Sequence, residues 1–133
     1  QAAVAILTDG NRVFLQKRPP GGLMANLWEF PGGKLEPGET PGAALKRELS
    51  EELGIKVKGA KKAGTIRHAY TSFSVTLHVF LVKIDPGEGL PDPGGDLPSG
   101  WFSPEEARCL PMPAANVKIL ARWVGEPDLG PEF

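Results

Sequence analysis

The chain has 133 residues, of which 41% are hydrophobic, and this is enough for one folded domain with a sizeable core. The formal net charge of −1 argues against a protein that binds polyanions over its whole surface, although it leaves room for local basic patches. The only cysteine, Cys109, excludes an intrachain disulfide and predicts a reducing compartment, the cytoplasm.

Neither a signal peptide nor an apolar run of about 18 residues is present, so we expect no membrane partner. The sequence begins at Gln1 rather than at a methionine. We therefore expect residues 1–133 to be a single domain, either trimmed or excised from a longer protein.

The first elements are two predicted strands, residues 2–9 and 11–18, around the turn residues Asp9-Gly10-Asn11. A short Asp-Gly turn between β-prone segments predicts a hairpin. The second strand ends at Arg18, and Pro19-Pro20-Gly21-Gly22 then predicts a loop.

A helix is predicted over residues 41–53. Thr40 can cap its start, Pro41 suits its first turn, and Gly54 can end it in the left-handed conformation. Apolar residues recur on one face at helical spacing. They are Ala44, Leu45, Leu49 and Leu53.

A second face of this helix carries Glu48, Glu51 and Glu52 at positions i, i+3 and i+4. Like charges at this spacing repel by roughly 0.2–0.5 kcal/mol per pair, so helix stability alone does not favour them. A hard divalent cation such as Mg²⁺ or Mn²⁺ would reverse the sign of that interaction. The alternative is a solvated acidic face, paired internally through Arg47 and Glu51.

The segment 33–55 resembles the Nudix box, GX5EX7REUXEEXGU, at every specified position. Gly33, Glu39, Arg47-Glu48-Leu49, Glu51-Glu52 and Gly54-Ile55 supply the pattern. The resemblance implies an α/β fold, the Nudix α/β/α sandwich with a mixed β-sheet. It also implies hydrolysis of a nucleoside diphosphate linked to another group.

The same resemblance implies roles for the residues of the box. Glu48, Glu51 and Glu52 would hold Mg²⁺ (or Mn²⁺), and a backbone carbonyl at Gly32 or Gly33 would complete the metal site. Arg47 would orient the carboxylates by pairing with Glu39 or Glu51. One glutamate would activate water, and which one does so is left open.

The stretch before the box, Leu23-Met24-Ala25-Asn26 with residues 28–34, resembles the MutT branch of the family, which hydrolyses damaged nucleotides. In this interpretation Phe30 stacks near the base of a nucleotide substrate, and Arg18 lies at the pocket rim.

After the helix, residues 55–70 are β-prone and basic. The positive charges either decorate an exposed strand or contact phosphate or DNA. They belong to Lys56, Lys58, Lys61, Lys62 and Arg67.

Residues 72–84 alternate apolar and polar side chains, which predicts a sheet strand. Its expected inward face has five residues. They are Phe73, Val75, Leu77, Val79 and Leu81. We interpret His78 as structural, whereas His68 lies near a loop and is either structural or a ligand contact.

Residues 85–100 are rich in proline and glycine and predict a long loop. Asp92 or Asp96 could approach the metal from this loop, and Asp96 is the candidate ligand outside the box. Trp101-Phe102 then resumes the sheet, and Ser103-Pro104-Glu105-Glu106 predicts a capped short helix.

A closing helix is predicted to place Ile119, Leu120 and Trp123 on one face, with Asn116 in its first turn. Asn116 either hydrogen-bonds locally or reads a base. The segment 113–116 resembles the one with which MutT-like enzymes present an asparagine to oxidised guanine. One amide can donate to O6 and accept from the protonated N7 of 8-oxoguanine, whereas guanine offers two acceptors there.

A second resemblance, carried by residues 66–73, 77–79 and 110–113, is to the C-terminal Nudix-fold domain of the adenine DNA glycosylase MutY. That domain recognises 8-oxoguanine in DNA and commonly lacks a complete box. Here the box is complete, although Ser72 stands where that domain often has histidine. We expect a MutT-type hydrolase of nucleoside triphosphates. The alternatives are the DNA-recognition domain and a non-catalytic nucleotide-sensing module.

Overall fold

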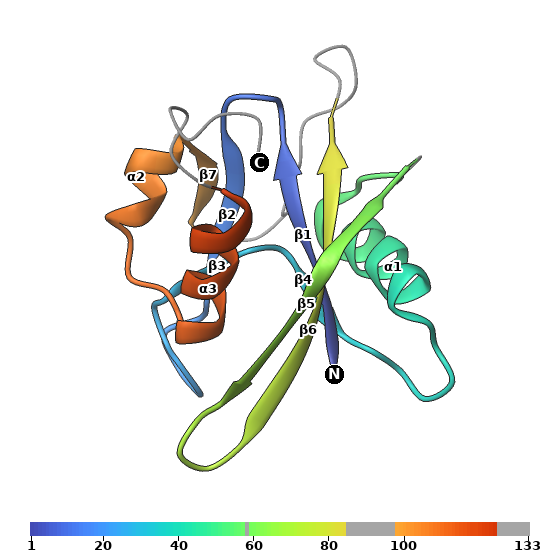
Figure 1. The fold of residues 1–133 in the computed structure, drawn as a ribbon, viewed down its shortest axis with the longest axis horizontal. Helices are drawn as coiled ribbons and strands as arrows, with labels where there is room; N and C mark the ends of the chain where they lie inside the picture. The colour runs from blue at the N-terminus through green and yellow to red at the C-terminus, as the bar shows by residue number, and fades with distance from the viewer. Residues whose placement is uncertain (58, 85–97, 125–133) are drawn as a thin grey trace.

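The computed structural model describes residues 1–57, 59–84 and 98–124. These residues form a mixed sheet with helices on both of its faces, as Figure 1 shows. The strands are β1 (Ala2–Thr8), β2 (Val13–Lys17), β3 (Trp28–Glu29), β4 (Gly32–Lys34), β5 (Lys61–Ala69), β6 (Ser74–Lys83) and β7 (Ser99–Phe102). The helices are α1 (Pro41–Leu53), α2 (Pro104–Arg108) and α3 (Ala114–Trp123).

The sheet is organised around β1. Along its main path the strand order is β3-β2-β1-β6-β5, while β4 also pairs with β1 and β7 with β2. The β1–β6 pair is parallel, and the other pairs are antiparallel. The predicted mixed sheet is therefore confirmed.

The N-terminal hairpin is confirmed as well. Thr8 lies opposite Val13, and the carboxylate of Asp9 accepts hydrogen bonds from the backbone N–H groups of Asn11 and Arg12 at 3.0 and 2.8 Å. The side chain of Asp9 thus holds the turn, as expected of aspartate in a tight connection.

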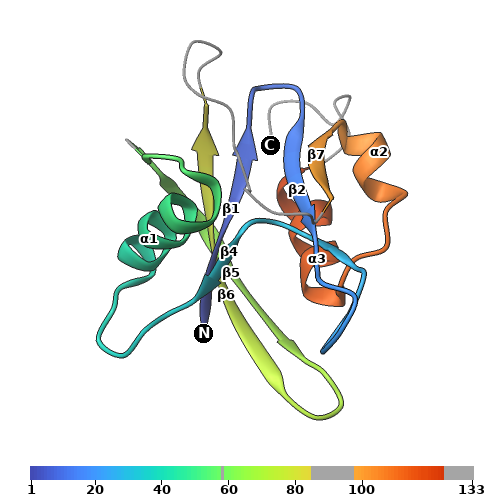
Figure 2. The same ribbon diagram turned by 180° about the vertical axis from the view of Figure 1, so that it is seen from behind.

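Two hydrophobic clusters lie on opposite faces of the sheet, because successive residues of β1 point to opposite sides. Ala3, Ala5 and Leu7 face α1, while Val4 and Ile6 face the side that α3 covers. Figure 2 shows α1 and the α2–α3 pair on the two sides of the sheet. The sandwich implied by the family resemblance is thus confirmed.

Helix α1 has the predicted bounds and caps. The side chain of Thr40 accepts from the N–H of Ala43, and Gly54 ends the helix with φ of +66°. The four residues predicted to be buried are buried. The capping box at Ser103 and Glu106 is also confirmed at the start of α2.

Two sequence expectations need correction, and one pair of strands was not predicted. Strand β5 begins only at Lys61, so the described residues of 55–60 lie outside it. Leu81 is 42% exposed rather than inward-facing, since the buried residues at this end of β6 are Phe80 and Val82, which face α1. Residues 28–34 contribute two short strands that composition alone did not predict.

In the described part of the chain, no helix is long and apolar enough to cross a membrane.

Candidate functional site

Arg47 organises the acidic residues of the box. Its Nε and Nη2 donate to the two carboxylate oxygens of Glu39 at 2.8 and 2.9 Å, and Nη1 donates to Glu48 at 2.8 Å. Nη2 also donates to the backbone carbonyl of Lys34 at 3.1 Å, which ties α1 to β4. The predicted pairing with Glu39 is confirmed, and Glu51 lies farther away at 3.4 Å.

These contacts keep both partners ionised. The hydrogen bonds from Arg47 and from the backbone of Glu36 hold the pKa of Glu39 at about 2. The same carboxylates raise the pKa of Arg47 above its ordinary value. A bidentate arginine of this kind fixes direction as well as charge, so Glu48 has a defined position.

Glu48 lies directly against Gly33. A Cβ atom added to Gly33 would come within 2.4 to 2.7 Å of the three carboxyl atoms of Glu48. A glycine leaves room for the carboxylate of Glu48 here, which explains sterically why the first residue of the box is glycine.

Glu52 stands beside Glu48 and is half-buried. Its Oε2 accepts from the side-chain amide of Gln16 in β2 at 3.4 Å. Burial, followed by the hydrogen bond and the charge of Glu48, raises the pKa of Glu52 to about 8. Ionisation of both carboxylates is therefore unfavourable in the absence of a cation.

The raised pKa predicts a pH dependence of stability in metal-free protein. Because the folded-state pKa lies above that of the unfolded chain, the stabilising contribution is complete below about pH 4.5 and is lost as pH rises through 8. After allowance for screening at a half-exposed group, we expect about 1–2 kcal/mol. Urea unfolding at pH 5 and pH 8.5, in chelator, measures it. In Glu52→Gln, the free energy of unfolding should change between pH 5 and pH 8.5 by this much less than in the parent. An equal change in both proteins would contradict the prediction.

The donor set fits a hard divalent cation. Carboxylates are the ligands that Mg²⁺ and Mn²⁺ prefer, and the unfavourable Glu48–Glu52 contact is what a cation would relieve. However, among the described residues no three side chains are grouped closely enough to hold a metal ion. Glu51, 62% exposed, is the member that stands apart.

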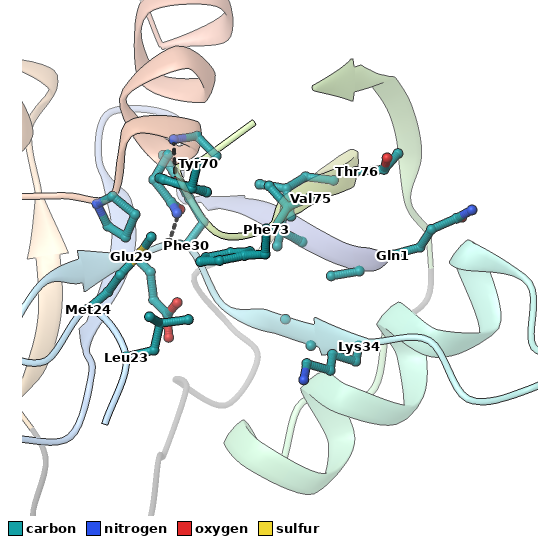
Figure 3. A pocket seen from close by; sticks show the side chains of 18 of the residues that line it. Gln1, Leu23, Met24, Glu29, Phe30, Lys34, Tyr70, Phe73, Val75 and Thr76 are labelled. Carbon is teal, nitrogen blue, oxygen red and sulfur yellow. Dashed lines mark hydrogen bonds between the residues drawn. The ribbon is translucent and has the colours of Figure 1, made fainter. Parts of the chain in front are cut away.

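The carboxylates of Glu48, Glu51 and Glu52 on α1 form what we call the acidic edge. A cavity of about 550 Å³ opens next to it (Figure 3). A volume of this size is typical of small-molecule sites. The cavity brings together four of the predicted site residues, Arg18, Phe30, Gly33 and Asn116. The side chains of Arg47 and the three glutamates are not part of its wall, so Gly33 is where the two regions meet.

Arg18 lines the cavity. Its Nη1 donates to Glu29 at 2.8 Å, and its Nε donates to the backbone carbonyl of Leu23 at 3.2 Å. Burial raises the pKa of Glu29, while the hydrogen bond and charge of Arg18 act in the opposite direction. Arg18 therefore holds the segment around Leu23 beside the cavity.

The sequence left open whether the side chain of Asn116 bonds locally or reads a base. In the described part of the chain, its oxygen bonds to a distant segment instead. Its Oδ1 accepts from the backbone N–H of Phe30 at 3.0 Å, across 86 residues of sequence. Asn116 is buried, and its amide is thereby fixed at the cavity wall. The ring of Phe30 is 2% exposed and belongs to the core on the α3 side.

The structure adds four residues that sequence reasoning missed, Gln16, Glu29, Tyr70 and Phe73. Tyr70 and Phe73 line the cavity from the β5–β6 turn. Their rings stack with centroids 4.9 Å apart, and Figure 3 shows Phe73 projecting across the cavity. The aromatic pattern Tyr70-x-x-Phe73 in a turn was the one available signal.

The remaining sequence candidates lie elsewhere. Asp92 and Asp96 fall outside the described residues. His78 bridges the side chains of Gln1 and Lys62 at 2.8 and 3.3 Å, which suits a structural role. Lys61, Lys62 and Arg67 are exposed on the edge strand β5.

Comparison with known proteins agrees with this architecture. The chain is 35% identical over 123 residues to an 8-oxo-dGTP diphosphatase of Escherichia coli, covering 92% of this chain and 94% of that protein. It is 33% identical over 130 residues to a CTP pyrophosphohydrolase of Escherichia coli, covering 93% and 90%.

Among solved structures, a MutT Nudix hydrolase from Burkholderia pseudomallei superimposes with a TM-score of 0.80 at 26% identity, covering 92% of this chain and 95% of that one. The C-terminal domain of mouse MUTYH, solved with human PCNA, gives 0.70 at 27% identity, covering 89% and 82%. The family model described as "NUDIX domain" matches residues 2–122, the span that holds the sheet, the box and the cavity. With the box complete and the sandwich in place, the chain belongs to the Nudix family and is a Nudix hydrolase.

Proposed function

We propose that this protein is a metal-dependent nucleoside triphosphate pyrophosphohydrolase of MutT type that acts on 8-oxo-dGTP and releases the monophosphate and pyrophosphate. The proposal is supported by the position of Gly33, where the cavity meets the carboxylates of α1. This residue lines the cavity that contains Asn116 and also lies against the carboxylate of Glu48. A nucleotide with its base near Asn116 would extend its phosphates toward the acidic edge.

Glu48, Glu51 and Glu52 are the residues that would hold Mg²⁺ or Mn²⁺, with the backbone carbonyl of Gly33 as a further ligand. When bound, the cation neutralises charge on the phosphoryl oxygens and lowers the pKa of water. Glu51, the exposed member, would reach the site by a rotamer change, which a solvated glutamate makes at little cost.

The protein's own contribution is positioning, which is the main requirement of phosphoryl chemistry. Arg47 fixes Glu48 through the contacts described above. We assign proton acceptance from the attacking water to Glu52, because its carboxylate lies half-buried next to Glu48 and is held by Gln16.

Base selection is assigned to Asn116. Its Oδ1 uses one lone pair on the N–H of Phe30 and keeps a second for the protonated N7 of 8-oxoguanine, while its NH₂ group donates to O6. Unmodified guanine would place an acceptor against the Oδ1 acceptor. Arg18, which also lines the cavity, is assigned to the substrate as well. Phe30 contributes through its backbone, and stacking falls to Phe73, whose ring is partly exposed.

Hydrolysis of matched nucleotides tests the proposal. With Mg²⁺ present, 8-oxo-dGTP should give 8-oxo-dGMP and pyrophosphate at a kcat/KM at least about tenfold above those of dGTP and CTP, a margin that one or two hydrogen bonds supply. Chromatography of both products identifies the cleaved bond. Preference for CTP would reassign the base pocket, and release of inorganic phosphate would reassign the point of cleavage.

A second candidate is recognition of 8-oxoguanine in DNA. The exposed basic side chains on β5 and the similarity to the mouse MUTYH domain favour it. Tight binding to duplex DNA containing 8-oxoguanine opposite adenine, without nucleotide hydrolysis, would support this candidate over the hydrolase.

The cytoplasm is the compartment that we propose, because Cys109 is exposed as a free thiol.

The contact at Gly33 gives a stereochemical prediction. In Gly33→Ala the new methyl group collides with the carboxylate of Glu48, which Arg47 prevents from simply moving aside. We expect kcat/KM to fall at least about tenfold, because displacement of a positioned catalytic group has effects of this size. The matched control is Gly42→Ala in α1, where a Cβ meets no atom within 4 Å. It should keep full activity, and equal activity of both variants would refute the steric role of Gly33.

A further inference from the structure

The start of α3 lacks the usual side-chain cap. Pro113 occupies the capping position and makes no side-chain hydrogen bond to the helix. The first N–H groups of a helix have no partners within the helix, so each needs one from elsewhere. The N–H of Asn116 donates to the carbonyl of Pro113 at 2.9 Å, but this leaves the N–H of Ala115 to be satisfied.

Tyr70 supplies that partner from a distant part of the chain. Its hydroxyl oxygen accepts from the N–H of Ala115 at 3.0 Å, across 45 residues of sequence. The hydroxyl therefore caps α3 from the β5–β6 turn. Ala115 is the residue directly before Asn116, so the bond fixes the backbone of α3 one residue ahead of the base-reading side chain. Figure 3 shows this bond together with that between Asn116 and Phe30.

Tyr70 itself is held rigidly. Its N–H donates to the carbonyl of Phe73 at 2.7 Å, closing the turn. Its ring stacks on that of Phe73 and meets the ring of His68 edge-on, with centroids 4.4 Å apart. The Nδ1 of His68 is buried and has no hydrogen-bond partner among the described residues, so His68 contributes here as a ring. The aromatic row His68–Tyr70–Phe73 thus sets where the hydroxyl stands.

Asn116 is consequently fixed from two directions. Phe30 fixes its side-chain oxygen, and Tyr70 fixes the start of α3 at the preceding residue, Ala115. A recognition amide must point its donor and its acceptor at separate atoms of one base edge, which leaves little angular tolerance. An amide free to rotate would offer the donor where the acceptor belongs, and it would then accept guanine as well as 8-oxoguanine.

We propose that Tyr70 is a positioning residue for base discrimination, acting on Asn116 through the hydroxyl cap of α3. The inference rests on the proposed function of Asn116 and extends it to a residue that does not itself read the edge of the base. It makes the β5–β6 turn part of the specificity of the site. Substrate preference should then depend on one hydroxyl group.

The test is Tyr70→Phe, which keeps the aromatic row and removes only the hydroxyl. We expect the ratio of affinities for 8-oxo-dGTP and dGTP, measured with Ca²⁺ in place of Mg²⁺, to fall about three- to tenfold, the range that one hydrogen bond supplies. The control is Ile119→Val, a buried change on the same helix that costs stability and removes neither of the hydrogen-bonding groups that anchor Asn116. It should leave the ratio unchanged.

A second measurement needs no substrate. In NMR spectra of free protein, the side-chain NH₂ signals of Asn116 should be sharp in the parent and in Ile119→Val, and broadened or doubled in Tyr70→Phe. Unchanged Asn116 signals in Tyr70→Phe, or an equal loss of discrimination in Ile119→Val, would overturn the inference. If the parent shows no preference for the oxidised nucleotide, the proposed substrate fails. The Asn116 signals then still decide whether Tyr70 orients that side chain.

Discussion

Glu52→Gln should lower turnover by about 10²- to 10⁴-fold, the usual contribution of a positioned proton acceptor, while leaving the fold intact. Glutamine has nearly the same shape as glutamate but cannot take up the proton from water. The substitution also removes an unfavourable half-buried charge, so the variant should be at least as stable as the parent at pH 8. Steady-state kinetics at saturating 8-oxo-dGTP, with circular dichroism of both proteins, measure the two effects.

The metal dependence of the melting temperature separates binding from chemistry in this variant. Millimolar Mg²⁺ should raise the melting temperature of the parent, because a ligand that binds only folded protein stabilises it. Glu52→Gln should lose most of that gain, whereas Glu105→Gln, an exposed change in α2, should retain both gain and turnover. If Mg²⁺ does not change the melting temperature of the parent, the assignment of the glutamates as metal ligands is wrong. Near-normal turnover in Glu52→Gln would move proton acceptance to another glutamate.

Asn116→Ala should erase most of the preference for 8-oxo-dGTP over dGTP. In the parent we expect a ratio of affinities of roughly ten to several hundred, because two hydrogen bonds and an avoided clash of acceptors contribute. The alanine variant also leaves the N–H of Phe30 without its partner, which costs about 1–3 kcal/mol of stability. Calorimetric titration with Ca²⁺ in place of Mg²⁺ gives both affinities without turnover.

Asn116→Asp separates the structural from the recognition role of this side chain. Aspartate can still accept from the N–H of Phe30, so more of the stability should return than in the alanine variant. It has no NH₂ group to donate to O6, so discrimination should stay low. Recovery of discrimination in the aspartate variant would show that the amide donor is not what reads the base. An unchanged ratio in Asn116→Ala would confine Asn116 to holding Phe30.

Local patterns predicted the scaffold well because they depend on neighbours in sequence. The caps of α1 at Thr40 and Gly54 and the turn at Asp9 are of this kind. The exposure of Leu81 was not predictable in this way. An alternating strand does not reveal where the covering helix ends, and α3 does not reach that end of β6.

The site was predicted in composition but not in arrangement. Helical spacing places Glu48, Glu51 and Glu52 near one another, yet contacts from Gln16 and Gly33 separate the half-buried pair from the exposed Glu51. The bonds from Phe30 to Asn116 and from Ala115 to Tyr70 join segments far apart in sequence, so no local pattern indicates them. The family resemblance supplied Asn116, and only the fold supplied Tyr70.

The parallel pairing of β1 with β6 has a consequence for how the chain folds. Residues 2–8 at the centre of the sheet pair with residues 77–83, so a loop of about 70 residues must close before the central ladder forms. Contacts of such long sequence separation slow folding. On the ribosome, β1 cannot complete its pairing until β6 has been synthesised. Until then the backbone N–H and C=O groups on that edge of β1 are open to other chains. The β2 hairpin and the short β4 can pair with β1 meanwhile, and they shield part of this strand during that interval.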